Sequence, residues 1–243
     1  MINKRYIVHW LTAIALAVVL TSIGVTASRH AADPVCSAMT ILIKDSLERQ
    51  YVSVGELQQQ LRQAGLWQIG EPLSHIRCQQ IEQHLLTHPM LRQVECYKLH
   101  RGDVRIVVSQ RRPVVLIAGD EHYYLDSDRR VMPVRASVNT PVVTVSGRIG
   151  KQQAEGEIYD LVTWLAGNSF WREKIHLIRV INPKMIELVD DTNHYTIVLG
   201  QIDGATKRLD DLQKLYEKGF AKIGYPAYKQ IDLQYTNQII GRK

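Results

Sequence analysis

The stretch YYLDSDRRVMP, residues 123–133, places two tyrosines, two carboxylates and two arginines between apolar flanks. Such a set is typical either of an active-site loop or of a tight turn between two strands. Alternating apolar residues precede and follow it, and Asp and Ser are common turn residues. The pattern predicts a β-hairpin. Asp126 and Asp128 remain an alternative acid–base pair, because both could project to one face of an extended segment.

Further strands are expected on both sides of this hairpin, each bounded by Gly, Pro, Asp or Asn. They cover residues 114–118, 122–126, 130–134, 141–147, 175–181, 185–190 and 194–200. Helices are expected over 156–167 and 205–223, the second with an apolar inner face. One more strand is predicted over 230–240. Residues 113–243 therefore form a mixed β domain with flanking helices and a C-terminal edge strand.

The preceding part of the chain shows a different order of elements. A strand at 39–46 is followed by helices near 53–65 and from 74, and then by strands at 92–100 and 103–110. Apolar stripes at helical spacing and strict alternation in the last strand support this assignment. The order predicts a separate β-α-α-β-β domain over residues 35–112. The whole exported part is thus expected to be α+β.

Residues 10–28, WLTAIALAVVLTSIGVTAS, carry no charge. As a helix they would be about 28 Å long, which is close to the thickness of a bilayer's hydrocarbon core. Lys4 and Arg5 precede them, so the positive-inside rule places residues 1–9 in the cytoplasm. The alternative is a cleaved signal peptide, with Val25 and Ala27 near the cleavage site. Either interpretation exports the remaining residues.

Charge and composition exclude few classes of function. The net charge is +6 and the pI is about 9.2, but Lys and Arg are scattered and no nucleic-acid recognition motif accompanies them, so we expect no nucleic-acid partner. The chain also lacks the G-x-S-x-G and H-E-x-x-H signatures. Asp190 and Asp191 are adjacent and would point to opposite faces of a strand. We therefore expect no enzyme, no cofactor and no small-molecule substrate.

The cysteines are Cys36, Cys78 and Cys96, which allow one disulfide and leave one thiol. His84 and His88 lie four residues apart on an expected helix, between Cys78 and Cys96, so a zinc site is an alternative. Buried cysteines and histidines on a polar face need no metal, and we expect none.

Several segments, taken in order, resemble the bacterial cell-division protein family FtsQ, also called DivIB. They are SQRRPVVLI (109–117), the opening YYLD and VMP, IELVDDTNHYTIVLG (186–200), KRLDDL (207–212) and IDLQYTNQI (231–239). The resemblance implies that residues 35–112 are a POTRA domain and that Tyr123, Tyr124, Asp126 and Pro133 are structural. Where the family has a turn Gly, this chain has Arg129. We expect Asp128 to take the strained backbone position instead.

The resemblance also implies a membrane-anchored, non-catalytic scaffold at the division septum, which helps to regulate septal peptidoglycan synthesis. Its last strand would bind FtsB/FtsL-like (DivIC-like) bitopic proteins by strand addition, and its POTRA domain would bind other division proteins. Carried over by position, Tyr235 and Asn237 are interface residues, with Gln238, Ile239 and Ile240 beside them. Cross-strand packing is the alternative role for Tyr235. The alternative functions are a POTRA-bearing export accessory protein and an exported cell-wall hydrolase that uses Asp126 and Asp128.

Overall fold

The computed structural model describes residues 10, 14–19, 33–45, 50–99, 101–135, 140–224, 228–235 and 238–243. These residues divide into two compact units. Unit 1 contains the described residues within Met1–Ile43, Val54–Leu85 and Val94–Val108, and unit 2 contains those within Lys44–Ser53, Leu86–Gln93 and Ser109–Lys243.

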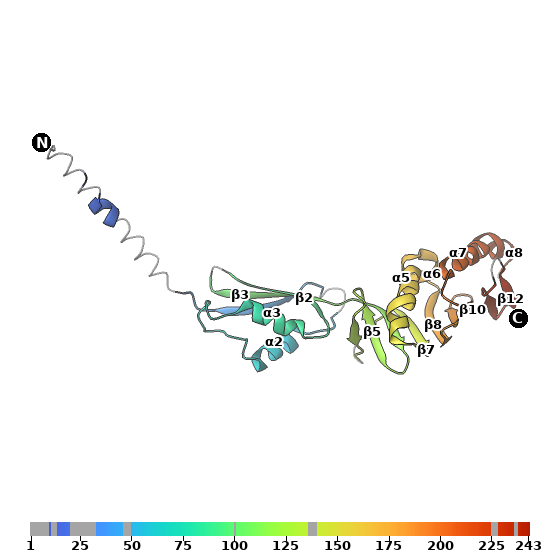
Figure 1. Ribbon diagram of the computed structural model, residues 1–243, viewed down its shortest axis with the longest axis horizontal. Helices are drawn as coiled ribbons and strands as arrows, with labels where there is room; N and C mark the ends of the chain where they lie inside the picture. The colour runs from blue at the N-terminus through green and yellow to red at the C-terminus, as the bar shows by residue number, and fades with distance from the viewer. Residues whose placement is uncertain are drawn as a thin grey trace. The chain divides into compact units, whose positions relative to one another are not determined.

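In unit 1 the described strands form one three-stranded sheet in the order β1-β3-β2. The elements that lie wholly or mostly in this unit are β1 (Ala38–Ile43), α2 (Val54–Gln63), α3 (Cys78–Leu86), β2 (Leu91–Lys98) and β3 (Asp103–Gln110). The two helices lie on one face of this sheet, as Figure 1 shows. They bury Leu57 and Leu61 from α2, and Ile81 and Leu85 from α3. The predicted β-α-α-β-β order is confirmed.

The described strands of unit 2 form one nine-stranded sheet in the order β12-β11-β10-β9-β8-β7-β4-β5-β6. They are β4 (Pro113–Ala118), β5 (His122–Asp126), β6 (Val131–Pro133), β7 (Val143–Gly147), β8 (Ile175–Asn182), β9 (Met185–Asp190), β10 (Tyr195–Gly200), β11 (Gln230–Asp232) and β12 (Ile240–Arg242). In β9 buried residues alternate with partly exposed ones, so one face of the sheet carries the core. The expected α+β class holds for both units.

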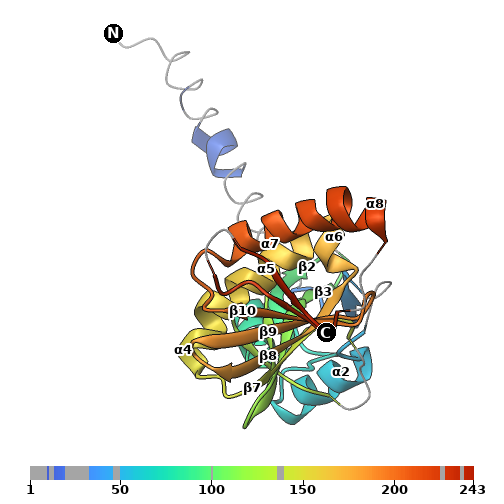
Figure 2. The ribbon, with the colours of Figure 1, turned by 90° about the vertical axis from the view of Figure 1, so that its right-hand side faces the viewer.

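Helices cover that face, as Figure 2 shows. They are α4 (Lys151–Gln153), the π-helical turn η1 (Ala154–Ile158), α5 (Tyr159–Gly167), α6 (Ser169–Arg172), α7 (Ala205–Leu215), the π-helical turn η2 (Tyr216–Phe220) and α8 (Ala221–Ile223). The sequence predicted two of these helical stretches but missed α6. The Asn168 side chain begins α6 by accepting hydrogen bonds from the amides of Phe170 and Trp171. Trp171 is fully buried in the core.

The hairpin at 123–133 is a turn held by a buried carboxylate. Asp126 Oδ1 accepts hydrogen bonds from the amides of Asp128 at 2.8 Å and Arg130 at 2.7 Å. Its Oδ2 accepts from Arg111 Nη1 at 2.6 Å. The carboxylate is thus engaged by the turn that it stabilises. This geometry supports the structural role of Asp126.

The expectation for the strained position of this hairpin is wrong. Arg129, and not Asp128, has a positive φ of 58°. Its guanidinium donates hydrogen bonds to the Glu155 carbonyl at 2.8 Å and to Asp160 Oδ1 at 2.6 Å. It also lies 4.6 Å from the centre of the Tyr159 ring. These contacts with η1 and α5 offset the left-handed backbone conformation, so no glycine is required.

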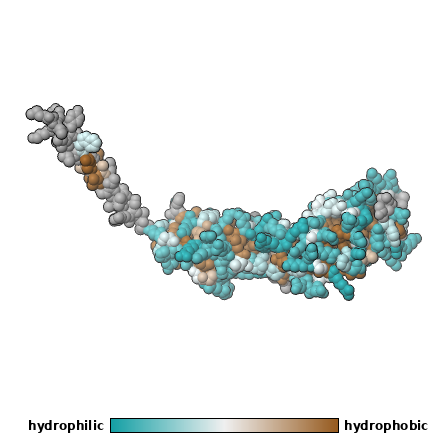
Figure 3. Space-filling model, viewed as in Figure 1, coloured by the Kyte–Doolittle hydropathy of each residue, from teal (hydrophilic) through white to brown (hydrophobic). Residues whose placement is uncertain are grey.

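Among the described residues, no helix is long and apolar enough to span a bilayer. The expected span over 10–28 is described only at Trp10 and residues 14–19, where the helix exposes apolar side chains (Figure 3). The rest of the span, and the predicted cytoplasmic residues 1–9, lie outside the described residues.

We expect Arg129→Ala to destabilise unit 2 more than Arg129→Gly does, by about 1 kcal/mol. Both variants lose the contacts with Asp160 and Tyr159, but only glycine removes the left-handed strain. Urea unfolding followed by the fluorescence of Trp164 and Trp171 measures the difference. Equal stability of the two variants would show that the backbone at this position is not strained.

Candidate functional site

The outer edge of the unit 2 sheet is formed by β12. Strand β11 pairs in parallel with β10, and β12 pairs antiparallel with β11, with Asp232 opposite Ile240. No strand of the described residues pairs with the other side of β12. The opposite edge of the sheet is β6, which contains Pro133 and therefore has one amide donor fewer. Of these two edges, β12 is the better template for an added strand.

The prediction of one strand over 230–240 is wrong. The chain leaves β11 at Asp232, turns, and returns as β12. Asp232 Oδ1 accepts a hydrogen bond from the Gln234 amide at 3.0 Å, which closes a turn after the strand. Leu233 is buried and anchors the turn to the core. Tyr235, Gln238 and Ile239 therefore lie in the connection between β11 and β12, and not in a strand.

Besides the backbone pairing of β11 with β12, two side-chain contacts hold β12 in place. Arg242 Nη2 forms an ion pair of 2.9 Å with Oδ2 of Asp232, whose side chain is 4% exposed. Gly241 lies directly on the ring of Tyr228, because a Cβ at this position would be only 2.7 Å from the ring carbons Cε2 and Cζ. Tyr228 packs in turn on Phe220 of η2, with 6.3 Å between the ring centres. The edge strand thus rests on the aromatic part of the core.

A pocket of about 260 Å³ lies beside this edge. It is lined by Arg208, Asp211, Leu233, Tyr235, Gln238 and Ile239. The first two residues come from α7, and the other four come from the connection between β11 and β12. Tyr235 is 51% exposed, although it is a large aromatic residue. We call this pocket and the outer edge of β12 the C-terminal edge site.

The polar side of the pocket is fixed by Arg208. Its guanidinium donates hydrogen bonds to the carbonyls of Asp203 at 2.7 Å and Leu199 at 3.3 Å, and also to the Gln201 carbonyl. Burial lowers the pKa of Arg208, while the nearby Asp203 acts in the opposite direction. On the solvent side, a hydrogen bond from Lys214 lowers the pKa of Asp211. The pocket therefore combines the apolar side chains of Leu233 and Ile239 with an aspartate that is paired with Lys214.

The structure gathers three of the five predicted interface residues in one pocket. These are Tyr235, Gln238 and Ile239, while Ile240 begins β12 and Asn237 lies outside the described residues. Sequence reasoning missed Arg208 and Asp211. Their spacing of three residues in KRLDDL places them on one side of α7, which was the available signal.

The other candidate residues have structural roles. Asp126 closes the hairpin, and Asp128 forms a paired contact with Arg92 at 2.9 and 3.0 Å. Asp190 is buried and accepts hydrogen bonds from the Thr192 amide and from the Tyr216 hydroxyl, both at 2.9 Å. Asp191 instead lies at the surface, where it contacts His176. Neither aspartate pair forms an acid–base site.

The zinc alternative finds no support in the described part of the chain. No group of three or more His, Cys, Asp or Glu side chains there could hold a metal ion. His88 is buried, and its Nδ1 accepts a hydrogen bond from the Met90 amide at 3.3 Å.

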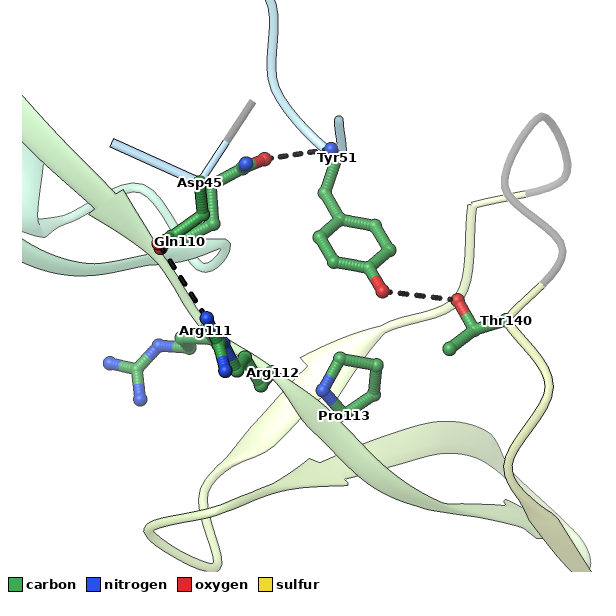
Figure 4. Close-up of a pocket in the computed structure, with 7 residues that line it drawn as sticks. All are labelled: Asp45, Tyr51, Gln110, Arg111, Arg112, Pro113 and Thr140. Atoms are coloured by element: carbon green, nitrogen blue, oxygen red, sulfur yellow. Dashed lines mark hydrogen bonds and ion pairs between the residues drawn. The ribbon is translucent and has the colours of Figure 1, made fainter. Parts of the chain in front are cut away.

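A second pocket of unit 2, shown in Figure 4, has a volume of about 450 Å³. It is lined by Asp45, Tyr51, Gln110, Arg111, Arg112, Pro113 and Thr140. Gln110 Oε1 accepts hydrogen bonds from the amides of Tyr51 at 2.7 Å and Val52 at 3.1 Å. Arg111 is engaged by Asp126, and Arg112 pairs with Asp45 at 3.7 Å. Its polar groups join segments of the unit to one another, so we assign this pocket a structural role.

Two family models match adjacent parts of the chain. The family model described as FtsQ/DivIB, C-terminal related, matches residues 112–242, which is more than half of the chain. The model of the POTRA-like domain matches residues 34–109. No curated protein matches the chain.

We expect Gly241→Ala to detach β12, because the added Cβ would overlap the Tyr228 ring. An overpacking cost of about 1.4 kcal/mol would raise the fraction of molecules in which β12 is detached from the sheet about tenfold. Limited trypsin digestion followed by mass spectrometry measures cleavage after Lys229. Gly167→Ala is the control, since a Cβ there meets nothing within 4 Å. Equal cleavage of both variants would contradict the packing of β12 on Tyr228.

Proposed function

Because this chain belongs to the FtsQ/DivIB C-terminal related family, we propose that it is a non-catalytic scaffold of the cell-division machinery. The observation that carries the proposal is the C-terminal edge site: a strand edge that no other described strand pairs with, beside an exposed tyrosine and a pocket lined by both polar and apolar side chains. The site has the features of strand addition, in which main-chain hydrogen bonds supply affinity and pockets select side chains.

The partner we propose is an FtsB/FtsL-like (DivIC-like) bitopic division protein. Its extended segment would lie along the outer side of Ile240–Arg242 and extend the sheet by one strand. Side chains of an added strand alternate between the two faces of the sheet, so one apolar side chain could enter the pocket between Tyr235 and Ile239. Tyrosine is a frequent hot-spot residue at protein interfaces.

The proposed location follows from the N-terminal sequence. An uncharged segment over 10–28, preceded by Lys4 and Arg5, would anchor the chain in the inner membrane with both units outside the cytoplasm. There the C-terminal edge site would meet the exported parts of its partners at the septum and help to regulate septal peptidoglycan synthesis. We propose that the POTRA-like unit contacts other division proteins.

We expect Tyr235→Ala to weaken partner binding at least about tenfold while leaving the stability of unit 2 nearly unchanged, because the side chain is half exposed. Titration calorimetry with the exported segment of the partner measures the dissociation constant. Tyr97→Ala is the matched control, since Tyr97 is 39% exposed and lies on β2 of unit 1. Loss of affinity in the control alone would move the interface to unit 1.

A chain that ends at Gln238 should lose the partner altogether, because it lacks β12 but keeps β11 and Leu233. It should also carry Asp232→Asn, since truncation removes the arginine that pairs with this buried carboxylate. Far-ultraviolet circular dichroism shows whether the variant is folded, and a pull-down shows whether it binds. A folded variant that still binds would contradict docking at β12. It would support the export-accessory alternative, in which an edge of the POTRA-like unit receives the partner.

A further inference from the structure

Cys78 and Cys96 both belong to unit 1, although 17 residues separate them in the sequence. Cys78 is the first residue of α3, and Cys96 lies in β2. One helical turn after Cys78, the carboxylate of Glu82 accepts a hydrogen bond of 2.7 Å from the amide of Cys96. Residues four positions apart share one face of a helix, so the face that carries Cys78 is held against β2 at Cys96.

Burial, and after it the nearby Cys78, raises the pKa of the Cys96 thiol, which agrees with this placement of Cys78 beside Cys96. We propose that Cys78 and Cys96 form an oxidation site, at which a disulfide links α3 to the edge strand β2. This inference does not depend on the proposed scaffold function. It requires only contact with a disulfide-bearing oxidant, which exported compartments supply.

The third cysteine has a different environment. Cys36 is buried, precedes β1, and its thiol donates a hydrogen bond to the Ala38 carbonyl at 3.5 Å. Cys78 is the most exposed of the three cysteines, since Cys36 and Cys96 are both buried. The expected product is therefore one defined bridge with Cys36 left as a thiol.

The accessibility and the acidity of the two thiols determine which cysteine reacts first with an oxidant. Burial, and to a smaller extent the nearby Cys78, raises the pKa of Cys96 far above its ordinary value, so its thiol is a poor first nucleophile. The partly exposed Cys78 is the thiol that an oxidant can reach. Cys78 is therefore the attacking residue and Cys96 the resolving one.

With oxidised glutathione as the oxidant, the reaction balances as a two-electron exchange. The Cys78 thiolate attacks one glutathione sulfur, which forms a mixed disulfide and releases one glutathione thiol. Cys96 then loses its proton and attacks the Cys78 sulfur, forming the protein disulfide and releasing the second glutathione. Two protein thiols are oxidised, and glutathione disulfide is reduced to two thiols.

The test uses the full chain, purified in detergent and incubated with oxidised glutathione. Remaining thiols are alkylated after denaturation, and the unreduced digest is analysed by mass spectrometry. We expect one linked peptide pair that contains Cys78 and Cys96, with Cys36 alkylated. Cys36→Ser should give the same link. Alkylation of all three cysteines, or a link that includes Cys36, would overturn the proposal.

Two variants separate the steps. Cys96→Ser should retain glutathione on position 78, because the resolving thiol is absent, whereas Cys78→Ser should take up little glutathione at position 96. Equal uptake by both variants would contradict the assigned order.

Thermal unfolding gives an independent readout if a variant folds poorly. In the oxidised wild-type chain, reduction should lower the melting temperature of unit 1 by at least about 5 °C, because the bridge restricts the unfolded chain. Cys36→Ser should show the same shift. The absence of a shift in both chains would contradict a bridge between α3 and β2.

Discussion

Buried carboxylates at strand ends govern the architecture of unit 2. Asp126 ends β5, Asp190 ends β9 and Asp232 ends β11, and all three are buried. A buried carboxylate without partners is costly, so each must be satisfied where it lies. Each accepts the backbone amide two residues later, and each also has a side-chain partner: Arg111, Tyr216 and Arg242, respectively. The reversals of the chain therefore occur at fixed positions in the sheet.

The third of these turns creates the C-terminal edge site. Because the chain reverses after Asp232, Leu233 enters the core while Tyr235 stays at the surface. The returning strand is then fixed by Arg242 and by the close approach of Gly241 to Tyr228. The pocket and the free strand edge are thus two consequences of one turn. A partner that adds a strand would find both in place before it binds, which reduces the ordering cost of association.

Local patterns predicted most of this fold, and long-range contacts account for the errors. The strands up to β10 and helix α7 follow from alternation and apolar spacing, whereas the structural role of Asp126 was implied by the family resemblance. The single strand expected over 230–240 was wrong because the reversal depends on Arg242 and Tyr228, which a short window does not connect to Asp232. Arg129 was misjudged because its compensating partners, Tyr159 and Asp160, are about thirty residues away. In the C-terminal edge site, Tyr235 was predicted from the family resemblance. Arg208 was not predicted, because it comes to line the same pocket as Tyr235 only in the folded chain.

Amide hydrogen exchange of the full chain, with and without the exported segment of an FtsB/FtsL-like partner, tests the central claim most directly. If the partner adds a strand at the outer edge, the amides of Ile240–Arg242 should exchange more slowly in the complex, together with those of residues 238 and 239. Slower exchange confined to β1 or β2 of unit 1, with β12 unchanged, would contradict docking at the C-terminal edge site.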